Sequence, residues 1–373
     1  MMIKNARIYL SPPHLSHQEM AYIQSALDNN WVAPVGENID LFERKVAEFT
    51  GSKYALALNS GTSAIHLALN LLHVSEGDEV ICPTFSFVAT ANPILYQKAT
   101  PVFIDSEKDT WNISPDRLEK AIQERIRLGK KPKAIVVVHI YGQAAQMSEI
   151  QQIAAYYQIP ILEDAAEALG STYGKRYLGT LGKVGILSFN GNKIITTSAG
   201  GMLLCDDKTL IDKGLHLSTQ ARDTAMHYEH SELGYNYRMS NILAGIGLGQ
   251  MEVLKERIRQ RRANFEFYKN KLEEKVIFQT ELKNSYSNRW LTCILTDSRE
   301  RRDKIHQALS AADIDARCLW KPLHLQALHQ KYPYYGEKVA QDLFERGLCL
   351  PSGSNLSTED KERISTLVLK AFD

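Results

Sequence analysis

The chain has 373 residues, of which 44% are hydrophobic and 23% are charged. These fractions are typical of a globular protein and exclude a disordered chain. Because 44 Lys and Arg residues nearly balance 43 Asp and Glu residues, the net charge of +1 creates no overall field that would attract nucleic acid or an anionic membrane. Any anion that the protein binds is therefore expected to be held locally, by backbone amides and a few cations.

Chain length and cysteine usage narrow the expectation further. A single core stops growing at roughly 250 to 300 residues, so a chain of this length predicts two domains. No Cys-x-x-Cys pair occurs, which argues against a zinc cage or a disulfide framework and favours a reducing compartment. The N-terminus lacks an apolar signal core, and no apolar run approaches the ~18 residues of a membrane span. We therefore expect a soluble, cytoplasmic protein that contacts neither membrane nor nucleic acid.

Two helices are expected at the start of the chain. In the first, Ser16 and Glu19 form a capping box, and Met20, Ile23 and Leu27 follow at helical spacing. The second carries an apolar face and ends at a glycine, which accepts the left-handed conformation that terminates helices. Its residues are Ile39, Phe42, Val46 and Phe49, followed by Thr50 and Gly51.

Short apolar runs then alternate with helical patterns. Continuous apolar strands separated by helices indicate a mostly parallel sheet that is covered on both faces. The last two strands lie close together in the chain, so the sheet should be mixed. One intervening helix begins at Ser114 and Pro115, with Leu118, Ile122 and Ile126 on one face. The seven expected strands are residues 54–58, 79–82, 102–104, 134–138, 160–162, 184–189 and 201–205.

A long helix, residues 241–274, is expected to bridge the sheet and a smaller C-terminal domain. Its latter half is crowded with charge, which predicts a solvated face. The charged residues are Lys255, Glu256, Arg257, Arg259, Arg261 and Arg262. The predicted fold class is α/β, with a large domain over residues 1–255 and a small α/β domain over residues 256–373.

The first chemical signal is a strand, a turn of small residues and a helix, over residues 54–69. The turn contains Ser60, Gly61 and Thr62. Such a turn exposes backbone amides at a helix N-terminus, where the helix dipole also favours a phosphate. Small residues form tight turns for steric reasons as well, so the segment alone does not establish a phosphate site.

The second signal is the apolar strand that ends in Glu163 and Asp164, with Glu167 close behind. In open α/β sheets, ligands bind at this carboxyl edge. A carboxylate there can pair with a protonated pyridine nitrogen and keep the ring an electron acceptor. Alternatively, Asp164 could cap a following helix.

The third signal is Lys193, which lies between two apolar strands in a loop of Asn, Gly, Ser and Thr residues. A partly desolvated lysine is suited to act as a nucleophile that forms a Schiff base. A lysine in an exposed loop is the alternative. The order and separation of phosphate turn, strand-end Asp164 and loop lysine favour one shared cofactor.

Several segments together resemble the sugar-nucleotide aminotransferases, a branch of the fold type I pyridoxal-phosphate (PLP) enzymes in the aspartate aminotransferase superfamily. The resemblance extends over nearly the whole chain and implies the fold of a fold type I PLP-transferase, with PLP as cofactor. The segments that carry it are residues 11–14, 60–64, 83–92, 163–167, 188–193 and 234–241.

The resemblance implies roles for particular residues. Lys193 would form the Schiff base and move the proton, and Asp164 would pair with the ring nitrogen. Phe87 would stack on the ring, although core packing is an equal alternative. Family members are homodimers with shared active sites. The other implied cofactor contacts are Gly61, Thr62 and Ser188 at the phosphate, Glu167 near the ring hydroxyl, and Asn236 of the partner subunit, also at the phosphate.

Further segments are similar to enzymes that aminate UDP-2-acetamido-2,6-dideoxy-4-keto-glucose at C4, in glycan and bacillosamine-type biosynthesis. These segments are residues 10–14, 30–34, 218–222 and 317–321. This similarity implies ping-pong transamination with L-glutamate as donor. It places Asn30, Trp31, Val32, Ala33, Arg317, Cys318, Leu319 and Trp320 at the sugar-nucleotide site. Small-domain packing with a surface ion pair is the alternative for Arg317 and Trp320.

Other activities stay open. GDP-4-keto-6-deoxymannose would require the same cofactor residues. A related sugar dehydratase would carry histidine in place of Lys193, and a non-catalytic sensor would have no need of Lys193, Asp164 and Ser188 together. His227 and His230 lack further ligands at fixed spacing, so no metal site is expected.

Overall fold

The computed structural model describes residues 6–373, and its main sheet contains all seven strands predicted from the sequence. The strand order is β1-β9-β8-β5-β4-β2-β3-β14, and β9 runs antiparallel to both of its neighbours while the other pairs are parallel. The seven strands are β1 Tyr54–Leu58, β2 Glu79–Pro83, β3 Thr100–Ile104, β4 Ala134–Val138, β5 Ile161–Asp164, β8 Val184–Ser188 and β9 Gly201–Cys205. The sheet is therefore mixed, as predicted.

An eighth strand, β14 (Tyr334–Tyr335), comes from the C-terminal part of the chain and pairs with β3. The prediction of seven strands is therefore one short. Two residues are too few to show the alternation by which a strand is recognised in a sequence.

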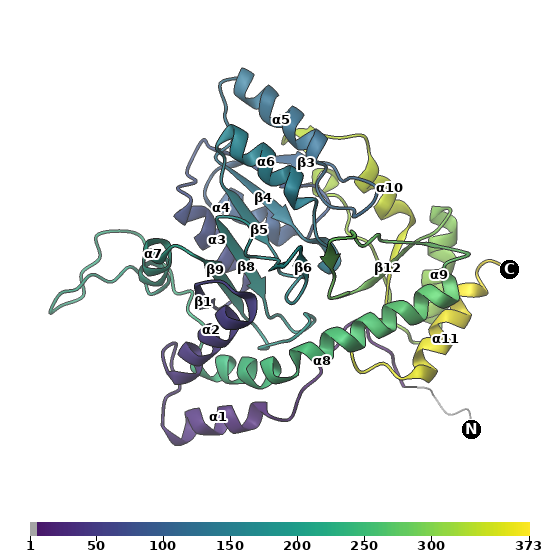
Figure 1. Cartoon of the computed structure of the whole chain (residues 1–373), viewed down its shortest axis with the longest axis horizontal. Helices are drawn as coiled ribbons and strands as arrows, with labels where there is room; N and C mark the ends of the chain where they lie inside the picture. Colours follow the sequence, from purple (N-terminus) through teal and green to yellow (C-terminus); the bar gives the residue numbers. More distant parts are fainter. Residues whose placement is uncertain (1–5) are drawn as a thin grey trace.

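Helices cover both faces of this sheet (Figure 1). Leu56 and Leu58 of β1 pack with α3, whereas Ala55 and Ala57 pack with α2. The helices of this part are α1 Glu19–Asp28, α2 Glu37–Thr50, α3 Gly61–Leu71, α4 Asn92–Tyr96, α5 Pro115–Arg127, α6 Met147–Tyr157 and α7 Lys208–Ser218, with short 3-10 helices at Val88–Thr90 and Ile140–Gly142. Alternate strand residues are thus buried on opposite faces, which explains the continuous apolar runs.

A smaller antiparallel sheet, in the order β10-β12-β15-β13, lies in the C-terminal part. Its strands are β10 Ile277–Phe278, β12 Thr292–Leu295, β13 Arg317–Cys318 and β15 Gly347–Leu350, and the neighbouring helices are α9 Arg299–Ala311, α10 Val339–Arg346 and α11 Thr358–Leu369. A third sheet joins β11 Ser285–Tyr286 to β6 Thr172–Tyr173 and β7 Arg176–Tyr177. The division at residues 255 and 256 stays a prediction, because α8 runs straight through it.

Helix α8 (Asn241–Leu272) runs from the large sheet to the C-terminal helices, close to the predicted range (Figure 1). The prediction of a solvated charged face is wrong for two of its arginines. Arg257 is 6% exposed and Arg261 is 1% exposed, whereas Lys255 and Arg259 are exposed. The two buried side chains donate to backbone carbonyls of segments that pack on the helix.

The N-terminal helices match the prediction unequally. Helix α2 ends at Gly51, whose φ of 73° is left-handed, as expected. In α1, however, Met20 is 63% exposed and Leu27 is 50% exposed, so the predicted apolar face is not covered by this chain. Glu19 does accept hydrogen bonds from Ser16, but the helix begins at Glu19 with Gln18 at its N-cap, so Ser16 lies too far before the helix to cap it.

The helix predicted at Ser114 and Pro115 is α5, and the Ser114 hydroxyl caps it. Leu118 and Ile122 are buried as expected, but Ile126 is 39% exposed near the end of the helix. Within residues 6–373, no helix is both long and apolar enough to cross a membrane.

Candidate active site

A cavity of about 470 Å³ opens at the carboxyl ends of β1, β5 and β8. The three chemical signals of the sequence all reach it. Its lining includes the predicted residues Gly61, Thr62, Phe87, Asp164, Glu167, Ser188, Lys193, Arg317 and Trp320. Gly61 and Lys193 are about 130 positions apart in the chain. They meet here because parallel strands present their carboxyl ends at the same edge of the sheet.

The first turn of α3 forms one wall of the cavity. Ser60 caps the helix, and its Oγ accepts from the Ser63 amide at 3.0 Å. A Cβ at position 61 would lie 3.1 Å from the Cβ of Ser188, so glycine allows the helix start and β8 to approach closely. The free amides and the positive end of the helix dipole make this wall suited to a phosphate.

Asp164 lies at the end of β5 and is 5% exposed. Its Oδ2 accepts from the Thr90 hydroxyl at 2.7 Å, and its Oδ1 accepts from the Ala166 amide at 3.2 Å. Burial raises the pKa of Asp164, whereas these two hydrogen bonds and the positive charge of Lys193 act in the opposite direction. Turns follow β5 where the alternative interpretation required a helix, so Asp164 does not serve as a helix cap.

Lys193 points into the cavity, and its side chain is only 13% exposed. Nζ lies 3.7 Å from Glu167 Oε1 and 4.2 Å from the centroid of the Trp290 ring. The alternative of an exposed loop lysine is therefore wrong. An amine that is largely removed from water, with a carboxylate beside it, is suited to covalent and proton-transfer chemistry.

Glu167 is 6% exposed, and burial raises its pKa to about 7 although Lys193 opposes this shift. Its Oε2 accepts from the Tyr141 amide at 2.6 Å. Tyr141 has a φ of 54°, an uncommon backbone conformation for a bulky residue. The backbone is therefore held in an unfavourable conformation where its amide meets Glu167.

Aromatic residues and an arginine form the outer part of the cavity. Phe87 is 50% exposed and its ring centroid lies 5.3 Å from that of Trp320, so Phe87 is not a core residue. Trp320 in turn lies nearly parallel to Tyr141 at 6.3 Å. The Arg317 side chain is 70% exposed, with a long contact of 3.9 Å to Asp315. Both Arg317 and Trp320 border the cavity, and neither is confined to small-domain packing.

Other predicted site residues do not line the cavity of the same chain. Residues 30–33 lie between α1 and α2, where Trp31 is 50% exposed and Val32 is 58% exposed. Asn236 is exposed after the long loop that follows α7. Leu319 is 1% exposed and belongs to the core, and Cys318 precedes it in β13. Within one chain, these residues therefore remain outside the site.

Among the cavity residues that were not predicted from the sequence, Thr90 and Trp290 contact predicted site residues. Thr90 lies within residues 83–92, one of the segments that carry the family resemblance. A hydroxyl that donates to the predicted Asp164 could have been sought in this segment. Trp290 carries no signal of this kind, because a single tryptophan in a loop has no periodicity. Within the described residues, no group of three or more His, Cys, Asp or Glu side chains could hold a metal ion.

Comparison with known proteins agrees with this geometry. The model of the DegT/DnrJ/EryC1/StrS aminotransferase family matches residues 13–369. The chain is 52% identical to the putative pyridoxal phosphate-dependent aminotransferase EpsN of Bacillus subtilis, covering 98% of this chain and 96% of the relative. It is 39% identical to GDP-perosamine synthase of Escherichia coli O157:H7, covering 93% of each.

A solved structure, the PLP form of the putative sugar aminotransferase Spr1654 from Streptococcus pneumoniae, has a TM-score of 0.90 and 27% identity, covering 98% of this chain and 100% of that one. PLP fits the cavity in this structure, since a helix N-terminus, a buried carboxylate and a buried lysine border one space. The chain therefore belongs to the DegT/DnrJ/EryC1/StrS aminotransferase family and is a PLP-dependent enzyme of fold type I.

Proposed function

We propose that this enzyme transfers the amino group of L-glutamate to C4 of a 4-keto-6-deoxy sugar nucleotide, and that the acceptor is UDP-2-acetamido-2,6-dideoxy-4-keto-glucose. The observation that carries the proposal is the meeting of Lys193, Asp164 and the α3 N-terminus in one cavity, with Arg317 and Trp320 at its outer part. An exposed guanidinium there is suited to a pyrophosphate, and an indole is suited to a sugar face. The product would serve glycan biosynthesis.

The chain's own residues account for cofactor binding. When bound, PLP supplies an aldehyde that exchanges nitrogen between amines and a ring that accepts electrons. The α3 amides at Gly61 and Thr62, with Ser188, would hold the phosphate. Asp164 would pair with the ring nitrogen, and the Thr90 hydroxyl orients this carboxylate. Phe87 would cover the ring face.

Lys193 Nζ would bind the cofactor covalently and, once released, move a proton from one reacting carbon atom to the other. Glu167 lies 3.7 Å from Nζ, close enough to hold or return that proton. Its pKa of about 7 means that both of its protonation states are populated near neutral pH. A sugar-binding sensor would not need such a pair, and a dehydratase of this family would carry histidine at position 193.

Trp320 borders the outer part of the cavity. Its Nε1 is buried and, among residues 6–373, has no acceptor. A buried donor without a partner is costly, so a small shift of the indole that brought Nε1 to a sugar or phosphate oxygen would relieve the cost. Residues 30–33 would reach the ligand only if a second chain placed them there.

We propose on this basis a homodimer with shared sites, with Asn236 of the partner subunit at the phosphate. The exposed apolar residues Met20, Leu27, Trp31 and Val32 are suited to an interface between copies. We further propose domains over residues 1–255 and 256–373. A cytoplasmic location is proposed because all five cysteines are free thiols.

A second candidate is amination of GDP-4-keto-6-deoxymannose. The 39% identity to a relative named GDP-perosamine synthase favours it. Both candidates use the same cofactor residues and differ only in the nucleotide and sugar. The choice between them therefore depends on the residues around Arg317 and Trp320.

The test is to incubate the purified protein with PLP, glutamate and a panel of UDP- and GDP-linked 4-keto sugars, and to measure 2-oxoglutarate and the amino sugar. The UDP-linked 2-acetamido sugar should react with the highest kcat/KM. A higher value for the GDP-linked sugar would select the second candidate, and no product from any would refute the substrate class. Lys193→Ala should remain folded and lose turnover.

Covalent attachment is tested separately. Borohydride reduction followed by peptide mass mapping should place the reduced adduct on Lys193. An adduct on another lysine would contradict the assignment.

A further inference from the structure

Two donors converge on the backbone carbonyl that precedes Lys193. The indole Nε1 of Trp290 donates to Asn192 O at 2.7 Å, and the hydroxyl of Ser11 donates to the same oxygen at 2.7 Å. Ser11 comes from the N-terminal segment and Trp290 from the segment before β12, so parts distant in the chain fix one peptide group. The position of the Lys193 backbone is therefore set by side chains outside its own loop.

The ring of Trp290 also lies against the end of the lysine side chain. Nζ of Lys193 is 4.2 Å from the ring centroid, within the range of a cation–π contact. Trp290 is 2% exposed, so little water competes for this ammonium. Glu167 Oε1 lies 3.7 Å from the same Nζ. The uncombined lysine is thus held between an aromatic face and a carboxylate.

A buried arginine holds Trp290 and Ser11 together. Arg261 donates from one guanidinium nitrogen to Trp290 O at 2.5 Å and from another to Ser11 Oγ at 3.0 Å. Both acceptors are uncharged, and burial together with the charge of Arg257 lowers the pKa of Arg261 to about 9. Its two contacts tie the N-terminal segment to the segment before β12.

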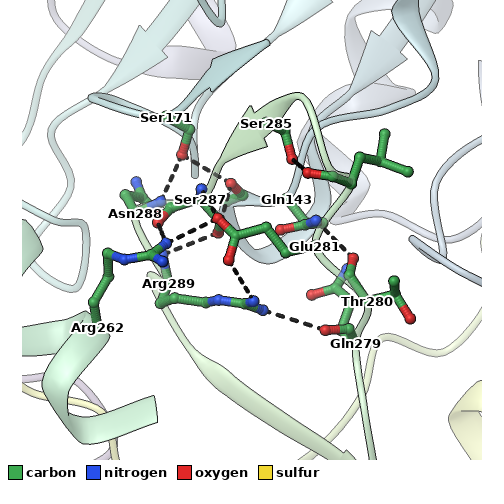
Figure 2. Close-up of polar contacts among 12 residues, drawn as sticks. Gln143, Ser171, Arg262, Gln279, Thr280, Glu281, Ser285, Ser287, Asn288 and Arg289 are labelled. Atoms are coloured by element: carbon green, nitrogen blue, oxygen red, sulfur yellow. Dashed lines mark hydrogen bonds and ion pairs between the residues drawn. The ribbon is translucent and has the colours of Figure 1, made fainter. Parts of the chain in front are cut away.

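Asn288 joins Trp290 to the other side of the lysine. Its Oδ1 accepts from the Trp290 amide at 2.9 Å, and its Nδ2 donates to Glu167 O at 3.0 Å. Figure 2 shows Asn288 within a dense set of polar contacts, where its own amide donates to Ser171. The two groups that hold Nζ are therefore connected through one side chain.

Ion pairs keep this segment in place. Glu281 accepts from Arg262 of α8 and from Arg289, both drawn in Figure 2, at 2.9 and 2.8 Å. Arg289 is 5% exposed, and its guanidinium lies 3.7 Å from the Phe265 ring centroid. Residues 281–289, which lead into Trp290, are thus anchored to α8, the helix that carries Arg262 and Phe265.

We propose that Trp290 is a positioning residue for Lys193, whose ammonium rests on the indole ring whenever the lysine is not bonded to the cofactor. Arg261 and Asn288 keep the indole in this place. The inference rests on Lys193 being the cofactor-binding residue. Between the two half-reactions the lysine is released from the cofactor. Its contact with the indole ring then keeps the amine inside the cavity, where it can bond to the cofactor again.

The experiment compares the accessibility of the Lys193 amine in matched variants. Trp290→Leu removes both the ring and the indole donor, and Trp290→Phe keeps a ring but removes the donor. Tyr268→Phe is the control, since it removes a buried hydroxyl that donates to Pro351 O, at 2.9 Å, in the C-terminal part. Each protein is labelled with acetic anhydride, both without cofactor and after reaction of the holoenzyme with glutamate alone. The label on Lys193 is measured against that on the exposed Lys53 by peptide mass spectrometry.

We expect Trp290→Leu to raise the relative labelling rate of Lys193 by roughly three- to thirtyfold, the range that a cation–π contact allows. Trp290→Phe should restore most of the protection, and Tyr268→Phe should equal the unchanged protein. In single turnovers with glutamate, Trp290→Leu should lower the maximal rate by roughly tenfold or more, while the glutamate concentration that gives half of this rate changes less than about threefold, because misplacement affects the proton transfer more than substrate binding.

Labelling of Lys193 in Trp290→Leu within twofold of the unchanged protein would overturn the inference, and so would an equal rise in Tyr268→Phe. If Trp290→Leu does not fold, Trp290→Met replaces it in the same comparison. Borohydride mapping of the unchanged protein distinguishes a failure of the proposed function from a failure of the role proposed for Trp290. An adduct away from Lys193 refutes the proposed function, whereas an adduct on Lys193 with unchanged labelling refutes only the role of Trp290.

Discussion

The pH dependence of stability should reveal the protonation of Glu167. Its carboxyl group is 6% exposed, and burial raises the pKa to about 7 in the folded protein without cofactor, from an ordinary value of 4.5. Between these two pH values only the unfolded chain loses the proton. The fold is therefore progressively destabilised as the pH rises from 4.5 to 7, and the effect is constant above that range.

The magnitude follows from the two pKa values. Since one pKa unit corresponds to about 1.4 kcal/mol, the difference between 4.5 and about 7 corresponds to about 3 kcal/mol. Glu167→Gln removes the titration but keeps a carbonyl oxygen that can accept from the Tyr141 amide. The free energy of unfolding of the variant should therefore rise by about 3 kcal/mol relative to the unchanged protein over this pH interval.

The assay is urea unfolding of the cofactor-free proteins at half-unit steps from pH 4.5 to 8, with the difference in free energy plotted against pH. Glu48→Gln, at an exposed position of α2, reports the effect of removing one carboxylate from the surface. A difference between Glu167→Gln and the unchanged protein that stays constant with pH would refute the reasoning. So would a difference that falls as the pH rises.

Three further outcomes are expected. Thr90→Val removes the donor to Asp164 and should slow single turnovers with glutamate by roughly ten- to hundredfold, the range for a lost hydrogen bond to a charged group, while Thr90→Ser should restore the rate. Gly61→Ala places a Cβ 3.1 Å from that of Ser188 and should raise the Kd for PLP, measured by absorbance titration, by roughly tenfold. An unchanged Kd would contradict a phosphate site at the N-terminus of α3. Gly185→Ala, in β8, would place a Cβ on the backbone carbonyl oxygen of Gly179 and should lower the free energy of unfolding, measured by urea titration, by about 2 kcal/mol or more.

The sheet and the inner half of the site could be predicted because they follow from local patterns. Each strand is a continuous apolar run, and parallel strands align their carboxyl ends. Residues that end β5 and β8, such as Asp164 and Ser188, must therefore lie near one another. The lysine loop follows β8 directly, so Lys193 had to lie near the same edge.

The surroundings of that edge could not be predicted in the same way. Arg257 and Arg261 lie in a charged stretch that is typical of a solvated helix, and only the packing of residues 11–15 and 290 against α8 buries them. The apolar face of α1 shows the opposite error. Periodicity identifies an apolar helix face that is suited to burial. It does not show whether residues of the same chain or of another chain bury that face.

Two carboxylates lie near one buried amine, and their environments assign them different tasks. Asp164 accepts from a hydroxyl and a backbone amide, which favour its charged form against the effect of burial. A cationic ring nitrogen would complete this balance, so binding of the cofactor and ionisation of Asp164 should reinforce each other. Glu167 accepts from one amide and has the pKa of a group that exchanges its proton near neutral pH. Asp164 thus lies where a cationic ring nitrogen would favour its charged form, and the exchangeable proton of Glu167 lies beside Lys193.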